Sequence, residues 1–128
     1  ADFISIHLPL NQETKNLINL KSFQAMKNSC VIVNTARGGI IDEQDLYDAL
    51  KENKIQAAGL DVFEQEPPPK DHPLFALPNI LVTPHNAALS LECRKRMAIE
   101  VCETVSFYLK DKEKLNKKNI INRKELGI

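Results

Sequence analysis

The chain has 128 residues, 43% of them hydrophobic and 27% charged, a composition typical of one folded domain of modest size. Seventeen basic residues offset seventeen acidic ones, so the charge gives no reason to expect a nucleic acid or an anionic membrane as partner. No apolar run reaches the ~18 residues that a membrane helix needs, and the first residues form no signal-peptide pattern. Three cysteines without CxxC spacing predict no metal site and favour a reducing, cytoplasmic environment.

Strands and helices alternate in the first half of the chain. Residues 30–34, CVIVN, form an apolar run that predicts a strand buried on both faces of a parallel sheet. Helical spacing of apolar residues follows Asp42, a good capping residue. This alternation predicts right-handed crossovers and a Rossmann-like, doubly wound α/β sheet. The expected elements are strands at 3–7, 30–34 and 57–63, a helix at 20–26 and a helix from Asp42 to about Asn53.

The second half contains a loop region and one long helix. Prolines punctuate residues 64–84, which indicates a loop with a short strand at 80–82. Apolar residues at helical spacing predict a long helix over 91–109, and the charged tail at 110–118 is typical of a solvated segment. Because the chain opens directly on a strand without a methionine, we expect it to be a piece of a longer protein.

Polar residues follow three of the predicted strands. His7, Arg37 and Asp61 stand at or just after strand ends, and the loops that follow add Glu66 and His85. In an open parallel sheet, ligands bind outside the carboxyl ends of the strands, so we expect these side chains to converge.

Two of these residues suggest chemistry. The planar fork of Arg37 suits a carboxylate ligand, and the adjacent glycines favour that role over a surface ion pair. His85, after Pro84 in a loop expected to be extended, is either a surface or capping residue or, with an acid beside it, a general acid/base. Spacing alone leaves Glu64 and Glu66 open as that acid.

Other polar residues have competing interpretations. Asp61 could cap the following turn or accept a hydrogen bond from a cofactor amide. The hydroxyl of Thr14 could donate to a phosphate, although a turn-stabilising role is the simpler interpretation. His7 is ambiguous, and His72 receives no functional role.

Four stretches of the chain resemble the D-isomer-specific 2-hydroxyacid dehydrogenases. They are HLPLNQETKNLIN, MKNSCVIVNTARGGIIDEQDLYDAL, AAGLDVFEQEP and NILVTPHNAALS, and they occur in the family's order. The resemblance implies that Arg37 binds the substrate carboxylate, that His85 exchanges the proton, and that Glu66 rather than Glu64 is the partner of the histidine. It implies NAD as cofactor, with NADP not excluded. The implied cofactor-binding residues are Leu8, Pro9, Thr14, Thr35, Ala36, Arg37, Asp61, His85, Asn86, Ala87 and Ala88.

The same resemblance predicts the organisation of the protein. Residues 1–90 would be the second half of the NAD-binding domain, and residues 91–128 would return toward a substrate domain. The G-x-G-x-x-G loop would lie upstream, so the 128-residue piece alone is expected to be inactive. Many members have a glycine pair where this chain has Ala87-Ala88.

The expected function is hydride transfer between NAD(H) and a small D-2-hydroxy acid or 2-keto acid, with 3-phosphoglycerate, glycerate and hydroxypyruvate as candidates. The alternative is an NAD-sensing regulator of the corepressor type. The parent protein is expected to be a cytoplasmic homodimer that binds neither nucleic acid nor membrane.

Overall fold

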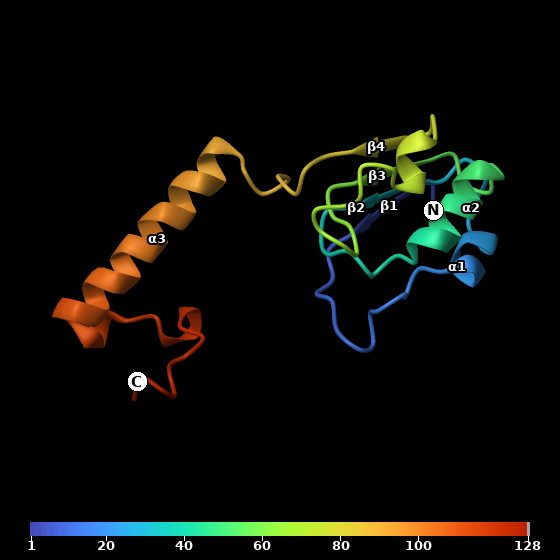
Figure 1. Ribbon diagram of the computed structural model, residues 1–128. Helices are drawn as coiled ribbons and strands as arrows, with labels where there is room; N and C mark the ends of the chain where they lie inside the picture. The colour runs from blue at the N-terminus through green and yellow to red at the C-terminus, as the bar shows by residue number, and fades with distance from the viewer. Residues whose placement is uncertain (128) are drawn as a thin grey trace. The chain divides into compact units, whose positions relative to one another are not determined.

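The computed structural model describes residues 1–127, and the chain divides into two units (Figure 1). The first unit comprises residues 1–87, and the second begins at Ala88. Among residues 1–127, no helix combines the length and the apolar character that crossing a membrane requires.

The first unit is built on a sheet of four parallel strands in the order β1-β2-β3-β4. The register aligns the last residues of the strands, with Ile6 beside Asn34, Asn34 beside Leu60, and Leu60 beside Val82. The carboxyl ends therefore form one straight edge, and the loops that leave it begin side by side. The strands are β1 (Phe3–Ile6), β2 (Val31–Asn34), β3 (Ala57–Leu60) and β4 (Ile80–Val82).

Helices α1 (Leu20–Gln24) and α2 (Glu43–Lys51) connect the first three strands, and the short 3-10 helix η1 (Pro73–Ala76) precedes β4. Because right-handed crossovers that step in one direction leave their helices on the same face, α1 and α2 lie next to each other (Figure 1). The core lies between these helices and the sheet. It includes Ile6, Phe23, Ile32, Ile40, Leu46, Leu50, Ile55, Ala58, Leu60 and Leu74.

The opposite face of the sheet is less covered. Burial alternates along β2, with Ile32 and Asn34 buried but Val31 and Val33 only half-buried, and Phe3 of β1 is 80% exposed. The expectation that residues 30–34 are buried on both faces is therefore wrong for this unit. The physical reason is that α1 and α2 cover one face only. The α/β architecture with its Rossmann-like parallel sheet is confirmed.

Local capping explains where the helices begin. The side chain of Asn19 accepts from the N–H of Lys21 and starts α1, and Asp42 accepts from the N–H of Asp45 and starts α2. Five predicted elements prove shorter in the structure. The second strand begins only at Val31, and α2 ends at Lys51. The first strand ends at Ile6, α1 ends at Gln24 and β3 ends at Leu60, whereas the strand at 80–82 is confirmed.

The second unit consists mainly of helix α3 (Leu91–Lys110), whose predicted bounds are confirmed within one residue. The hydroxyl of Ser90 accepts from the N–H of Cys93 and caps its first turn. Two 3-10 turns follow, η2 (Lys112–Lys114) and η3 (Lys117–Asn119), so the charged tail has more local structure than the sequence predicted.

Candidate active site

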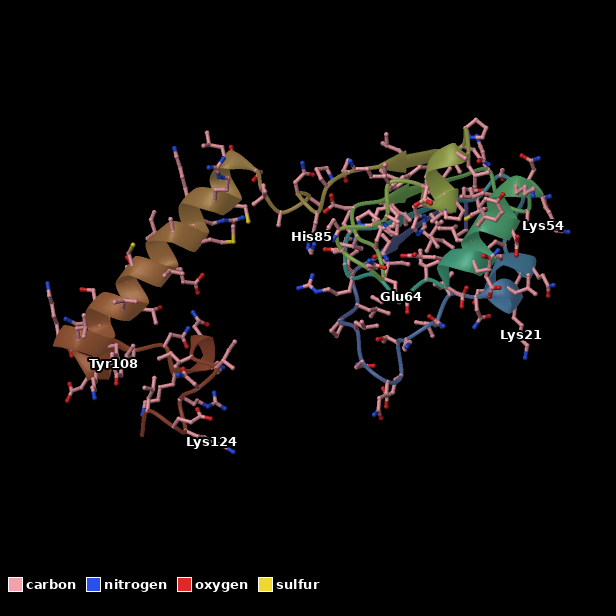
Figure 2. All side chains as sticks on the ribbon, in the orientation of Figure 1. Lys21, Lys54, Glu64, His85, Tyr108 and Lys124 are labelled. Atoms are coloured by element: carbon pink, nitrogen blue, oxygen red, sulfur yellow. The ribbon has the colours of Figure 1, made fainter. Side chains whose placement is uncertain are left out.

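The residues singled out in the sequence lie along the carboxyl edge of the sheet. His7 follows β1, Arg37 follows β2 and Asp61 follows β3, while His85 follows β4. Figure 2 draws the side chains of this edge and labels His85. The parallel register brings four chain segments together, which is the arrangement that open α/β sheets use for ligand sites.

The structure places His85 in contact with Glu66. The distance from His85 Nδ1 to Glu66 Oε2 is 2.6 Å, and the side chains are 49% and 36% exposed. Glu64 lies away from His85 (Figure 2), so the choice that spacing had left open is decided in favour of Glu66.

The Glu66 carboxylate is held in its charged form. The hydrogen bond from His85 lowers the pKa of Glu66, and a second bond from the Phe63 N–H to Oε1, 3.0 Å long, lowers it further. Partial burial opposes these effects, and the positive charge of Arg37 adds to them. Because an ionised carboxylate only accepts hydrogen bonds, Nδ1 of His85 carries the proton of this contact. Nε2 is then the ring nitrogen available for proton exchange.

The backbone of His85 differs from the extended loop that the sequence predicted. Its φ is +50°, in the left-handed region that costs a residue with a side chain about 1–2 kcal/mol. Two backbone acceptors hold it there, since the His85 N–H donates to the carbonyls of Asp61 at 2.9 Å and Thr83 at 3.1 Å. Strain of this kind persists where surrounding bonds over-determine the conformation.

The side chain of Asp61 completes that support. It is 3% exposed, and its carboxylate accepts from the Thr83 hydroxyl and from the N–H groups of Asn86 and Ala87, at 2.9 and 2.8 Å. Burial raises the pKa of Asp61, but the Thr83 hydroxyl and the two N–H groups outweigh it, so the pKa is lowered. The carboxylate therefore clamps the turn that carries His85, which is the turn-capping alternative.

Arg37 lies in a neighbouring hollow of about 740 Å³. Its Nη1 donates to the Ala36 carbonyl at 2.7 Å. Glu66 and His85 line a different hollow, of about 560 Å³, although the charge of Arg37 acts on Glu66. The structure therefore places Glu66 and His85 in direct contact, whereas Arg37 lines a separate hollow. The hollow that contains Arg37 is lined by His7, Leu8, Pro9, Leu10, Thr35, Ala36 and Arg37.

Two residues hold the Arg37 turn: Asn34, which the sequence analysis missed, and Gly38, one of the two glycines that it singled out. Asn34 is buried at the end of β2, where its side chain donates to the Arg37 carbonyl at 2.9 Å and accepts from the Ala36 N–H at 3.0 Å. A Cβ on Gly38 would lie 1.9 Å from the Phe63 carbonyl oxygen, so only glycine allows this turn to approach the Glu66 loop. A polar residue closing an apolar strand was the available signal for Asn34.

The remaining predicted cofactor residues fall into three groups. Leu8, Pro9, Thr35 and Ala36 line the hollow beside Arg37. Thr14 instead stabilises its own turn, because its hydroxyl donates to the Pro9 carbonyl at 2.7 Å and accepts from the Asn11 N–H at 2.8 Å.

The segment after the histidine forms the third group. The N–H groups of Asn86 and Ala87 are taken up by Asp61, while Ala88 already belongs to the second unit. These two N–H groups serve the fold of the loop.

The hollow beside Arg37 suits part of a dinucleotide. It opens at the carboxyl ends of β1 and β2, and its walls combine apolar side chains with His7, Thr35 and the cation of Arg37, which fits a flat ring and an anionic group. The four glycines of the chain form no G-x-G-x-x-G loop, so the pyrophosphate half of such a site is not supplied by these residues. Within the part of the chain that the structure describes, no three side chains of the metal-binding types are grouped to hold a metal ion.

Comparison with known proteins identifies the family. Residues 1–87 match the family described as "D-isomer specific 2-hydroxyacid dehydrogenase, NAD binding domain". The chain belongs to this family, and its first unit is an NAD-binding domain or part of one.

Two relatives show how much of a complete protein the chain represents. It is 47% identical over 122 residues to the D-3-phosphoglycerate dehydrogenase of Methanocaldococcus jannaschii, covering 95% of this chain and 23% of that protein. It is 49% identical over 105 residues to the glyoxylate reductase of Korarchaeum cryptofilum, covering 82% and 32%. The chain thus spans between about a fifth and a third of the length of these relatives.

Solved structures share the fold. The D-lactate dehydrogenase of Lactobacillus jensenii, determined with NAD+, superposes with a TM-score of 0.76 at 36% identity, covering 81% of this chain and 35% of that one. An acyclic imino acid reductase, Bsp5, determined with NADPH and D-Arg, gives a TM-score of 0.78 at 40% identity, covering 85% and 34%.

Proposed function

We propose that the complete protein carrying this chain is an oxidoreductase that transfers a hydride between NAD(H) and a small D-2-hydroxy acid or its 2-keto acid. The observation that supports it most directly is the 2.6 Å contact between Glu66 and His85 at the carboxyl edge of the sheet. Histidine is the side chain that most often exchanges a proton with a reacting hydroxyl, and a carboxylate partner favours its protonated form. The relatives carry dehydrogenase and reductase names, which favours the enzyme over the corepressor-like regulator.

The proposed proton path uses one nitrogen of His85. In the oxidation direction, neutral Nε2 accepts the proton of the substrate hydroxyl. Nδ1 remains bonded to Glu66, whose negative charge stabilises the imidazolium that forms. In the reduction direction, the protonated Nε2 donates to the carbonyl oxygen. Bound NAD supplies the nicotinamide ring that accepts or returns the hydride.

Arg37 is proposed to bind the substrate carboxylate and polarise the oxygen at C2. Its charge and its place beside the Glu66–His85 pair support this role, because a planar guanidinium matches a carboxylate with two parallel hydrogen bonds. Leu8, Pro9, Thr35 and Ala36 would line the cofactor site. NAD is the expected cofactor, and NADP is not excluded, since relatives of similar fold were determined with either form.

The remaining expectations concern the whole protein. Residues 1–90 are proposed to be the second half of the NAD-binding domain, and residues 91–128 a segment that returns toward a substrate domain. The parent protein is proposed to be a cytoplasmic homodimer acting on small acids, without a nucleic acid or membrane partner.

A panel of substrates tests the function. The intact protein is assayed with 3-phosphoglycerate, glycerate, lactate, glyoxylate and hydroxypyruvate, each with NAD(H) and with NADP(H). Turnover of at least one acid is expected. Tight NADH binding without turnover of any acid would contradict the proposal and favour the regulator.

A substitution of Arg37 tests its proposed role in binding the substrate carboxylate. Replacing it in Arg37→Lys keeps the charge and removes the bidentate geometry. Because a hydrogen bond to a charged group contributes about 1.5–3 kcal/mol, kcat/KM should fall by about 10- to 150-fold. Arg94→Lys, at an exposed position of α3, is the matched control and should leave kcat/KM unchanged. Equal values for the two variants would exclude the proposed role.

A further inference from the structure

A second histidine–carboxylate pair lies beside the candidate active site. Glu43, the first residue of α2, places its Oε2 3.1 Å from Nε2 of His72, and the two side chains are only 17% and 14% exposed. Nδ1 of His72 accepts the N–H of Leu74 at 3.3 Å, so the ring proton is on Nε2 and is donated to Glu43. Both ring nitrogens are therefore engaged within the protein.

The other oxygen of Glu43 reaches the Glu66 loop. Oε1 accepts the N–H of Glu64 at 2.6 Å, while the preceding N–H, that of Phe63, donates to Glu66 Oε1 at 3.0 Å. Two consecutive N–H groups of one loop are thus bound by two different carboxylates. The Glu43 bond fixes the chain two residues before the acid that contacts His85.

Aromatic packing joins the pair to the same loop a second time. The Phe63 ring meets His72 edge-on, with centroids 5.4 Å apart, and meets Phe75 edge-on at 5.6 Å. Phe63 and Phe75 line the hollow that Glu66 and His85 also line. Orientation of the His72 ring, which the bond to Glu43 sets, therefore bears on the wall behind the active pair.

We propose that Glu43 and His72 are positioning residues that set the Glu66 carboxylate against His85. Within the loop from Phe63 to Glu66, the Phe63 N–H binds the Glu66 carboxylate, and the Glu43 carboxylate anchors this loop to the N-terminus of α2. Neither residue lines the hollow of Glu66 and His85 or the hollow that contains Arg37, so both act through Glu66. The inference rests on the proposed role of the Glu66–His85 pair, but it can be tested without turnover.

The test measures the pKa of Glu66. The intact protein is labelled with ¹³C at glutamate Cδ, the Glu66 resonance is assigned with Glu66→Gln, and the pKa is read from its shift against pH. The groups that face Glu66 are His85, the Phe63 N–H and Arg37, and none is altered in the variants. In Glu43→Gln and His72→Phe the anchor is lost, so Glu66 should become a roughly threefold weaker acid than in the unaltered protein.

Rescue and control variants separate positioning from general destabilisation. His72→Gln keeps a donor toward Glu43 and should restore the Glu66 pKa. Glu52→Gln, at the exposed far end of α2, should leave it unchanged. A purely structural pair would lower the melting temperature of the variants without moving the Glu66 pKa, and that result overturns the proposal.

Two further outcomes are a failure of the variants to fold and full turnover by Glu66→Gln. If Glu43→Gln and His72→Phe do not fold, Glu43→Asp is titrated instead, because it keeps the charge but withdraws the carboxylate by one methylene, and the same two results apply. If Glu66→Gln retains full turnover, the proposed function fails while the pKa comparison still decides whether Glu43 and His72 position Glu66.

Discussion

The first unit contains two histidine–carboxylate pairs that combine the same residue types but differ in burial and in the bonds of the second ring nitrogen. In the Glu66–His85 pair, Nδ1 faces the carboxylate and about half of the histidine side chain is exposed. In the Glu43–His72 pair, Nε2 faces the carboxylate, a backbone N–H occupies Nδ1, and both side chains are mostly buried. A histidine can exchange protons with a ligand only through a nitrogen that the protein leaves open. The difference between a chemical group and a structural one is therefore set by the bonds on the second nitrogen.

The largest expected effect is the loss of kcat when His85, the histidine with an open ring nitrogen, is replaced. His85→Asn in the intact protein should lower kcat by about 10²- to 10⁴-fold, the usual contribution of a general acid/base. His72→Gln, which retains the donor to Glu43, should lower kcat by less than about tenfold under the same conditions. Steady-state kinetics at saturating cofactor measures both, and equal losses would show that the two pairs are not functionally different.

A second prediction concerns the clamp beneath His85. Asp61→Asn replaces one acceptor oxygen with a donor and leaves the Ala87 N–H unsatisfied, at a cost of about 1–3 kcal/mol in the free energy of unfolding. Denaturant unfolding monitored by circular dichroism measures this change. Thr83→Val removes only the hydroxyl bond and should cost less than Asp61→Asn. The reverse order would show that the carboxylate does not hold the turn.

The third prediction compares the contributions of the two histidines to stability. Removal of His72 in His72→Ala leaves Oε2 of the mostly buried Glu43 carboxylate without its donor, so the free energy of unfolding should fall by about 1–3 kcal/mol. His85→Ala removes a half-exposed ring and should change it by less than about 1 kcal/mol. Thermal unfolding of both variants at neutral pH checks the difference.

The smallest effect is the dependence on pH. Because contact with His85 and the Phe63 N–H lowers the pKa of Glu66, its contribution to stability is present above the ordinary pKa of a glutamate and disappears as pH falls through the lowered value. Glu66→Gln should therefore flatten the acid side of the stability curve, below about pH 4.5. Glu52→Gln, at the exposed C-terminal end of α2, leaves Glu66 and its hydrogen-bond donors in place, so its acid limb should keep its slope. Urea midpoints measured across that range distinguish the two.

The sequence predicted most of the architecture because its signals are local. Alternating apolar runs and capping residues such as Asn19 and Asp42 placed the strands and helices, and strand ends placed His7, Arg37 and Asp61 at one edge. Spacing could not choose between Glu64 and Glu66; the resemblance to a family did, and the contact with His85 agrees.

What the sequence could not supply was long-range geometry. Glu43 and His72 are 29 residues apart, and no periodicity links a helix start with a proline-rich loop. The left-handed backbone of His85 was also unforeseen, since a positive φ remains uncommon at any residue other than glycine, histidine included. Single-faced coverage of the sheet depends on which face the crossovers take, and a run such as residues 30–34 carries no information about that.

The glycine at position 38 has a consequence for how the Arg37 turn and the Glu66 loop tolerate substitution. Because a Cβ at position 38 would collide with the Phe63 carbonyl, the backbone of the Arg37 turn packs directly against the backbone of the loop that leads to Glu66. Any larger residue at position 38 would have to push one of these segments away from the other. A substitution there would therefore disturb the Arg37 turn and the Glu66 loop together, although neither functional side chain had been changed.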